Sequence, residues 1–343
     1  GGLRVGDGRG PRLSRRRPLS TALVLGAGGT VGLAYHAGAL KALHEVAGFN
    51  PDDSDLVIGT SAGSVVAAYI RAGWSIQDLW NLVLSGVQLP PGPVSDAEEE
   101  HDSGILPDLF ARAFDTPVDL IRRSLGSAFV MSRSVLRLPL PVLPGPLRRA
   151  FPGGLFRMSD GRLRLESELP SEWPRKAIWL CAVDIVSGRR IVLGRSRPPR
   201  MTLAQAVMAS CAIPGVYPPV RYGRRELIDG GAHSTTNLDL AARAGSDLII
   251  SLVPMGFDPS DPPGCAGRLV RRFANATLDA ELGQADRKGS HVFLFRPGAA
   301  EARIHGINLM RAGDLAPVAQ AAYEATARRL ESGTLERMLR TVA

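Results

Sequence analysis

The chain has 343 residues, of which 45% are hydrophobic and 22% charged, a composition typical of a globular protein with a sizeable core. Its formal net charge is +8, and no apolar run approaches the roughly 18 residues that a membrane-spanning helix needs. The three cysteines, Cys181, Cys211 and Cys265, form no C-x-x-C pair. We therefore expect reduced thiols or buried small hydrophobes rather than disulfides.

Positive charge is concentrated in two stretches. Residues 1–20 hold six arginines against one aspartate, and residues 133–164 hold seven arginines against one aspartate. We expect 1–19 to be a disordered basic tail, because it has no apolar periodicity. Such stretches favour anionic partners such as a membrane surface, although ordinary solvation explains them equally well. We expect no nucleic acid partner, because no recognisable nucleic-acid-binding module accompanies the arginines.

Two strand–loop–helix units open the rest of the chain. Residues 23–25 are apolar and lead through a glycine-rich loop, 26–32, into a stretch with helical spacing. Residues 56–58 repeat the plan with a second glycine-rich turn and a helical run that Gly73 would end. Consecutive units of this kind predict a parallel sheet with helices on its faces.

The regular pattern breaks down between about 86 and 170. Proline clusters, an acidic run and a basic stretch interrupt short helical segments there, which predicts an inserted cap or lid. Residues 133–151 mix large apolar residues with arginine and proline. This composition suits a segment that lies on a membrane as well as a lid packed on the core, and we expect the lid.

Regular structure resumes near residue 177. We expect one hairpin that turns at Ser187–Gly188 and a second that ends at Asp229–Gly230–Gly231, with a helix between them that stops at Pro214. The sequence then predicts a helix over 235–245 and a buried strand over 247–255. Beyond these, His291 would begin a strand, and the stretch from 307 is mostly helical. We expect residues 20–343 to form a single domain.

The second glycine-rich turn has the pattern G-x-S-x-G, as Gly59-Thr60-Ser61-Ala62-Gly63. This pattern is typical of a nucleophilic serine on a sharp strand-to-helix turn, where the flanking glycines relieve crowding. The start of a helix also favours developing negative charge. A glycine-rich chain produces the bare pattern by chance, so the interpretation depends on the apolar strand before Ser61 and the helix after it.

The first glycine-rich loop, 26–32, has three interpretations. The dinucleotide pattern G-x-G-x-x-G fails, because Val31 takes its sixth position and the last glycine comes one residue late. Backbone N–H groups of such a turn can form an oxyanion hole for acyl transfer. The glycines can also serve the turn alone. Asp229-Gly230-Gly231, taken by itself, predicts only a turn.

A serine nucleophile needs a base, and no histidine here is an obvious one. The histidines are His36, His44, His101, His233, His291 and His305. The order Ser61, Asp229, His305 fits an α/β-hydrolase, but that fold places several strands before its nucleophile, and only one precedes Ser61. His233 lies four residues after Asp229 and is a candidate helper.

Taken together and in order, these motifs resemble those of the patatin-like phospholipase family. The glycine loop AGGTVG, the turn GTSAG and the later DGG correspond to the three family motifs, and ASCAIPGVYPP and AVDIVSGRRIVL extend the similarity. The resemblance covers about residues 21–255, with a variable middle insertion. It implies a three-layer α/β/α sandwich with a mostly parallel central sheet and a helical or irregular cap.

The resemblance also implies a serine acyl hydrolase with a Ser–Asp dyad. Ser61 would attack a lipid carboxylic ester, and Asp229 would act first as base and then as acid. The remaining implied site residues are the oxyanion-hole glycines Gly28 and Gly29 with Gly32 supporting their turn, and the nucleophile-elbow glycines Gly59 and Gly63. The implied substrates are phospholipids, lysophospholipids or neutral lipids, with no metal and no cofactor.

One departure and two open questions accompany this interpretation. Many family members carry Arg or Lys where this chain has Val31, which leaves the headgroup preference and the oxyanion geometry open. A non-catalytic lipid-binding module on the same fold is the alternative function, and the intact Ser61 and Asp229 argue against it. The arginines at 15–17 resemble a twin-arginine export signal, but cleavage there would destroy the first strand, so we expect a cytoplasmic protein with optional peripheral membrane contact.

Overall fold

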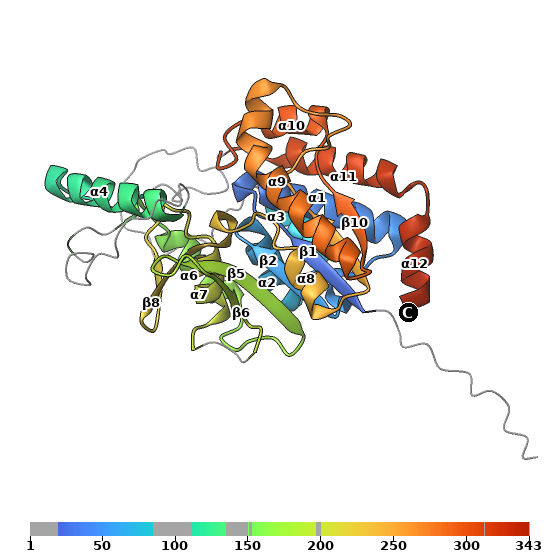
Figure 1. The fold of residues 1–343 in the computed structure, drawn as a ribbon, viewed down its shortest axis with the longest axis horizontal. Helices are drawn as coiled ribbons and strands as arrows, with labels where there is room; N and C mark the ends of the chain where they lie inside the picture. The colour runs from blue at the N-terminus through green and yellow to red at the C-terminus, as the bar shows by residue number, and fades with distance from the viewer. Residues whose placement is uncertain are drawn as a thin grey trace, which may run out of the picture.

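The computed structural model describes residues 20–84, 111–134, 150, 153–196, 200–311 and 313–342. The expected basic tail, and with it the predictions for residues 1–19, lies outside the described residues. So does most of the stretch 133–151 that the sequence assigns to a lid. The described residues form a sheet with helices on both of its faces (Figure 1).

The central sheet has the strand order β10-β9-β1-β2-β5-β8-β7, and β6 also pairs with β5. Its strands are β1 (Thr21–Leu25), β2 (Leu56–Thr60), β5 (Ala177–Asp184), β6 (Arg190–Leu193), β7 (Val220–Tyr222), β8 (Arg225–Asp229), β9 (Leu248–Leu252) and β10 (His291–Phe295). From β10 to β5 neighbouring strands are parallel, whereas β6, β7 and β8 pair in antiparallel fashion. The predicted parallel sheet and both predicted hairpins are therefore confirmed. A separate ribbon pairs β3 (Ala111–Arg112) with β4 (Phe156–Arg157).

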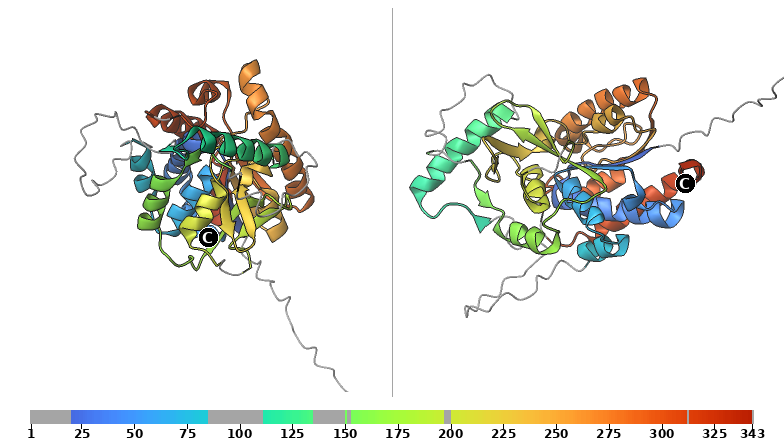
Figure 2. Two further views of the ribbon diagram at one scale, coloured as in Figure 1. Left: turned by 90° about the vertical axis from the view of Figure 1, so that its left-hand side faces the viewer. Right: turned by 90° about the horizontal axis from the view of Figure 1, so that it is seen from below.

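Helices cover the two faces of this sheet as separate layers (Figure 2). The described helices are α1 (Gly29–Ala47), α2 (Ala62–Arg71), α3 (Ile76–Leu84), α4 (Pro117–Ser134), α6 (Ser159–Glu168), α7 (Leu203–Ser210), α8 (Asp239–Ala244), α9 (Cys265–Arg287), α10 (Ala299–His305), α11 (Ala316–Leu330) and α12 (Thr334–Val342). Alternate residues of β1 enter different cores: Leu23 and Leu25 pack with α1, α2, α7 and α11, while Ala22 and Val24 pack with α8 and α9. The expected mostly parallel α/β/α arrangement is thus present.

The register along β5 brings two distant segments together. β6 pairs with Leu180–Val183 on one edge of β5, so β2 and β8 must share the other edge. On that edge Thr60 is opposite Cys181, and Asp229 is opposite the next residue, Ala182. The end of β2 therefore meets the end of β8, and the residues that follow Thr60 lie beside Asp229.

The helix before β9 is shorter than the sequence predicts. Residues 235–238 are not helical, and α8 begins only at Asp239. Asn237 has a positive φ of 56°, and its side chain donates hydrogen bonds to the Thr60 hydroxyl at 3.0 Å and to the Ser234 carbonyl at 2.7 Å. These side-chain bonds compete with helical ones, which explains the late start.

The part of the inserted region that is described contains a longer helix than expected. α4 has 18 residues, begins with Pro117, and is capped by the Thr116 hydroxyl, which accepts a bond from the Asp119 amide at 3.2 Å. One face of α4 packs on the sheet, where Val130 joins a small core with Ile228 of β8. The helix therefore rests on the strand that ends at Asp229 and projects from the body of the protein (Figure 1).

Candidate active site

Ser61 lies on a sharp turn between β2 and α2. It has a φ of 52° and a ψ of −122°, a backbone conformation that a serine adopts at an energetic cost of about 1–3 kcal/mol. The turn is tight, because a Cβ on Gly63 would lie 2.0 Å from the Leu25 carbonyl oxygen. The G-x-S-x-G spacing is thus explained by the close approach of α2 to β1, and the strained serine is typical of a nucleophile elbow.

Side chains from two helices fix the backbone of Ser61. Its amide donates to the Ser210 hydroxyl at 3.0 Å, and that hydroxyl donates to the Cys181 carbonyl at 2.6 Å. Its carbonyl accepts a bond from the Ser64 hydroxyl at 2.6 Å. Ser210 is fully buried near the end of α7 and had no role in the sequence analysis. The only sequence signal for a role of Ser210 is its place in ASCAIPG, among the residues that extend the family resemblance.

A polar network lies behind the turn, on the other face of the sheet. Asn237, which bonds to Thr60, accepts a hydrogen bond from Arg190 at 2.9 Å. Arg190 also forms a bidentate ion pair with Asp239, at 2.6 and 2.7 Å, and both side chains are largely buried. Because each member is satisfied by the next, the network holds the end of β2 firmly in place.

Asp229 ends β8 and faces the same cavity as Ser61. Only 5% of its surface is exposed, and its Oδ1 accepts a bond from the Gly231 amide at 2.7 Å. Burial raises the pKa of the Asp229 carboxyl to about 6, while the nearby Ser61 hydroxyl and the Gly231 amide act in the opposite direction. This carboxyl is therefore a much stronger base than an exposed aspartate, and it remains mostly ionised at neutral pH.

The glycine loop completes the wall of this cavity. Gly28 and Gly29 both line it, and among the described residues no acceptor binds their backbone N–H groups. α1 begins at Gly29, so its dipole directs positive potential into the same space. Gly32 donates its amide to the Gly28 carbonyl at 2.8 Å. The loop thus offers two unused donors beside Ser61, and Gly32 supports their turn.

A later segment of the chain covers the glycine loop. The Thr30 hydroxyl donates to the carbonyls of Leu309 and Arg311, and the Val31 amide donates to the Leu309 carbonyl. Gly29 has a φ of +61°, and a Cβ there would lie 2.4 Å from the same Leu309 oxygen. The side chain of Val31 is fully buried in the core. Residue 31 therefore helps to pack α1 and contributes no charge to the cavity.

None of the described histidines lines the cavity that holds Ser61 and Asp229. His36 is fully buried, and its Nε2 lies 2.8 Å from the Gly26 carbonyl, so it supports the glycine loop from behind. His305 is also buried and contacts Arg271 at 3.3 Å. His233 borders a separate polar cavity, and His291 is exposed at the start of β10. His101 lies outside the described residues.

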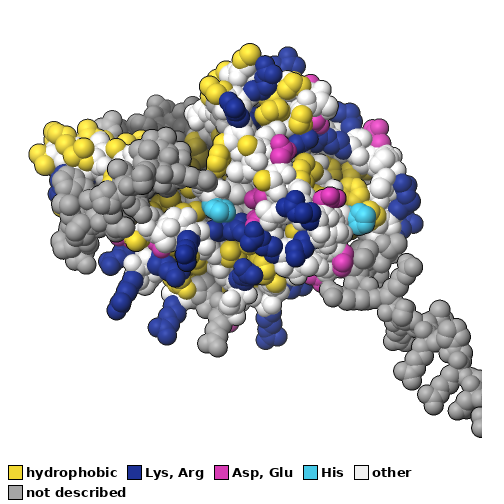
Figure 3. Space-filling model, in the orientation of Figure 1, with side chains coloured by type: hydrophobic (Ala, Val, Ile, Leu, Met, Phe, Trp, Pro, Cys, Tyr) yellow, Lys and Arg dark blue, Asp and Glu magenta, His cyan; other side chains and the backbone are white. Residues whose placement is uncertain are grey.

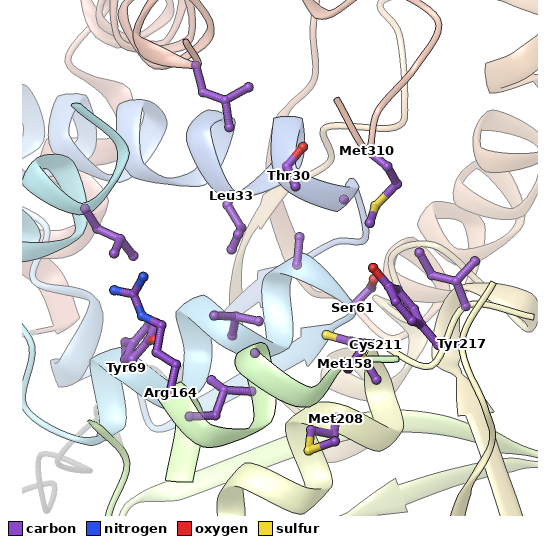
Figure 4. A pocket seen from close by; sticks show the side chains of 18 of the residues that line it. Thr30, Leu33, Ser61, Tyr69, Met158, Arg164, Met208, Cys211, Tyr217 and Met310 are labelled. Atoms are coloured by element: carbon purple, nitrogen blue, oxygen red, sulfur yellow. The ribbon is translucent and has the colours of Figure 1, made fainter. Parts of the chain in front are cut away.

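Two cavities meet at Ser61. The Ser61–Asp229 cavity has a volume of about 310 Å³ and is also lined by Ile213, Phe273 and Met310. The second, which we call the apolar cavity, has a volume of about 150 Å³, and Ser61 shares its lining with Leu33, Val65, Leu165, Met208 and Leu315. Figure 4 looks into the apolar cavity, with Ser61 near one end and Tyr69 and Arg164 near the other.

The other chemistry-bearing groups do not compete with Ser61. Cys211 borders the apolar cavity, but burial raises the pKa of its thiol to about 12, so it stays protonated. All three cysteines are free thiols, as expected. In the described part of the chain, no three His, Cys, Asp or Glu side chains gather as a metal site would require. Within the same ranges, no helix is long and apolar enough to cross a membrane.

Comparison with known proteins places this arrangement in a family. The profile described as Patatin-like phospholipase matches residues 23–89 and 103–242, which is more than half of the chain and includes both glycine-rich turns and Asp229. The chain belongs to the patatin-like phospholipase family. The resemblance inferred from the three motifs is thereby confirmed.

Among solved structures, this patatin-like chain is similar in backbone course to two bacterial proteins. VipD from Legionella pneumophila matches with a TM-score of 0.41 at 14% identity, over 92% of this chain and 67% of VipD. The type III effector protein ExoU matches with a TM-score of 0.39 at 15% identity, over 93% of this chain and 54% of ExoU. ExoU in its complex with SpcU from Pseudomonas aeruginosa matches with a TM-score of 0.37 at 19% identity, over 92% and 52% of the two chains. This chain spans about half the length of ExoU.

Proposed function

We propose that this patatin-like protein is a serine acyl hydrolase that cleaves carboxylic esters of lipids, with Ser61 as nucleophile and Asp229 as its base. The observation that carries the proposal is the register on β5, which sets Asp229 beside the strained turn of Ser61 in one cavity. A carboxylate whose pKa lies near 6 is suited to general-base catalysis close to neutral pH. Family membership supports an ester of a lipid as the substrate.

The first half of the reaction transfers the acyl group to the enzyme. Asp229 takes the proton of the Ser61 hydroxyl as Oγ bonds to the ester carbonyl carbon, which gives a tetrahedral intermediate with a negative oxygen. The Gly28 and Gly29 amides, helped by the α1 dipole, stabilise that oxygen. The bond to the leaving alcohol then breaks, and Asp229 returns the proton to the alcohol.

The second half returns the enzyme to its starting state. A water molecule gives a proton to Asp229 and attacks the acyl carbon, and a second tetrahedral intermediate forms. Its collapse releases the fatty acid, and the proton on Asp229 returns to Ser61 Oγ. The apolar cavity next to Ser61 is suited to the acyl chain, because its lining is almost entirely hydrophobic. No step needs a metal ion or a cofactor.

The test measures fatty acid release from phospholipid vesicles, lysophospholipid and triglyceride emulsion. Wild-type protein should release fatty acid from at least one of them, and Ser61→Ala should not, with an unchanged circular dichroism spectrum. Ser54→Ala is the matched control, because Ser54 is also buried and its hydroxyl has no hydrogen-bond partner among the described residues. If the protein is a non-catalytic lipid-binding module, the wild type will release no fatty acid from any of the three substrates.

A further inference from the structure

Exposed apolar side chains gather on two segments of the described chain. Among the described residues twelve large hydrophobic side chains are exposed, and eight of them belong to α4 and to the region of α9 and α10. We call Val118, Ile121, Leu125 and Met131 the α4 stripe, and Leu269, Phe273, Ile304 and Ile307 the α9–α10 cluster. Hydrophobic surface is visible over both segments in Figure 3. Scattered apolar residues are ordinary, but exposed apolar residues that gather on the same segments mark interaction surfaces.

The α9–α10 cluster borders the Ser61–Asp229 cavity, and the Met131 end of the α4 stripe lies close to it. Phe273 lines this cavity and is 45% exposed, so the cavity reaches the surface there. Ile307 is followed by Leu309 and Met310, which also line it. On the other side, Met131 of α4 packs against Gly215, directly after the lining residues Ile213 and Pro214. The cavity therefore reaches the surface at the α9–α10 cluster, and α4 lies near its lining residues Ile213 and Pro214.

The two segments are held as parts of a rigid rim. The inner face of α4 buries Val130 against the sheet, and the Ser127 hydroxyl accepts a bond from the Gly154 amide at 2.9 Å. On the other side, Arg271 of α9 is buried and bonds to His305, at the end of α10, at 3.3 Å. The outward apolar residues are thus carried by elements that the core already fixes.

Cations accompany the apolar residues on this rim. Arg268, Arg272 and Arg303 are exposed beside Leu269 and Ile304, and among the described residues no carboxylate forms an ion pair with any of them. Arg122, next to Ile121 on α4, donates to the Ala150 carbonyl rather than to a carboxylate. Apolar side chains interspersed with unpaired arginines match a surface with an apolar interior and anionic headgroups.

We propose that the α4 stripe and the α9–α10 cluster form one docking face for an anionic phospholipid bilayer, which brings the mouth of the Ser61–Asp229 cavity against the lipid. The apolar side chains enter the boundary of the acyl region, and the arginines contact lipid phosphates. This proposal rests on the proposed function and deepens it. It assigns membrane contact to described residues of α4, α9 and α10, whereas charge along the sequence points only to the basic stretches 1–20 and 133–164.

The test measures sedimentation with vesicles of phosphatidylcholine containing about one third phosphatidylglycerol, with all proteins carrying Ser61→Ala so that no lipid is consumed. The test variant combines Ile121→Ser, Leu125→Ser, Leu269→Ser and Ile307→Ser. The matched control combines Val46→Ser and Val186→Ser, which are 40% and 37% exposed and lie on other elements. We expect at least about tenfold weaker binding for the test variant and less than about twofold for the control.

Charge is tested separately. Arg268→Gln with Arg272→Gln should remove most of the preference for phosphatidylglycerol over pure phosphatidylcholine, and raising salt from about 50 to about 500 mM should weaken binding of the unmodified face. Circular dichroism checks the fold of each variant. If the fourfold variant unfolds, the α4 pair and the α9–α10 pair are tested separately, and each should weaken binding by about threefold.

Three outcomes would overturn the docking face: a folded test variant that binds vesicles as the unmodified protein does, a control that loses as much binding, or sedimentation velocity showing that these substitutions abolish self-association instead. Binding is measured without hydrolysis, so it reports on the docking face alone. If the Ser61→Ala protein binds vesicles but the wild-type protein releases no fatty acid, the docking face stands and the proposed function is contradicted.

Discussion

Asp229→Asn should slow ester hydrolysis while it stabilises the protein above pH 6. The substitution keeps the shape of the side chain. It also keeps an oxygen that can accept the hydrogen bond that the Gly231 amide donates to the Asp229 carboxylate at 2.7 Å. It removes the basicity that the proposed mechanism assigns to Asp229, so turnover should fall by about 10² to 10⁴. It also removes a buried charge that is costly to form, so the substitution that lowers turnover should raise the free energy of unfolding.

The size of that stabilisation follows from the pKa. The folded pKa of Asp229 is about 6, against an ordinary value of 3.8. The pKa of Asp229 is higher in the folded protein than in the unfolded chain, so the folded state binds this proton more tightly. The stabilisation that results is fully present below about pH 4 and is lost as the pH rises through about 6. Asparagine has no such proton, so the stability advantage of the variant should widen by about 2.5 kcal/mol between pH 4 and pH 8.

Urea unfolding at the two pH values measures this difference, and a soluble short-chain ester measures turnover. Asp184→Asn is the control for activity, because Asp184 is also a buried aspartate at the end of a strand but does not line the Ser61–Asp229 cavity. Its turnover should stay within about threefold of wild type. An Asp229→Asn protein that keeps its turnover, or whose stability advantage is the same at both pH values, would refute the reasoning.

Four further predictions concern the cavity and its supports. Wild-type turnover on a soluble ester should rise with pH and reach half its maximum near pH 6, because Asp229 must be ionised; a rate that is constant down to about pH 4.5 would contradict this. Val65→Trp should fill the apolar cavity and lower hydrolysis of long-chain relative to short-chain p-nitrophenyl esters by about tenfold, whereas Val46→Trp should not change that ratio. His36→Ala should lower the free energy of unfolding by about 2–4 kcal/mol in urea, since it leaves the Gly26 carbonyl without its partner and opens a cavity, while exposed His291→Ala should leave it unchanged. Activity should survive EDTA. Inhibition by EDTA that added calcium or zinc reverses would contradict the metal-free mechanism.

The local elements could be predicted from the sequence because their signals are local. An apolar run, a glycine turn and helical spacing around Ser61 are enough to place β2 and α2. The two hairpins follow equally well from their turn residues. α8 is the instructive failure. Its apolar spacing predicts a helix from residue 235, but the Asn237 side chain satisfies Thr60 and Ser234 instead of its own helix.

The supports of the site could not be predicted, because they depend on contacts between distant parts of the chain. The bond from the Ser61 amide to Ser210 joins residues 149 positions apart. The cover over the glycine loop brings Leu309 to Thr30, 279 positions apart. Periodicity carries no information about such pairs. The pairing of Ser61 with Asp229 was available only from the order of the family motifs, and the register on β5 gives its physical basis.

The most direct test of the Ser61–Asp229 assignment is the rate at which a fluorophosphonate labels Ser61, read by mass spectrometry of the labelled peptide. Wild-type protein should be labelled at Ser61, and Ser61→Ala should not be labelled. His233→Ala, His291→Ala and His305→Ala should react at rates close to wild type, and Asp229→Asn should react at least about 100-fold more slowly. Rapid labelling of Ser61 in Asp229→Asn, together with its loss in a folded histidine variant, would contradict the assignment.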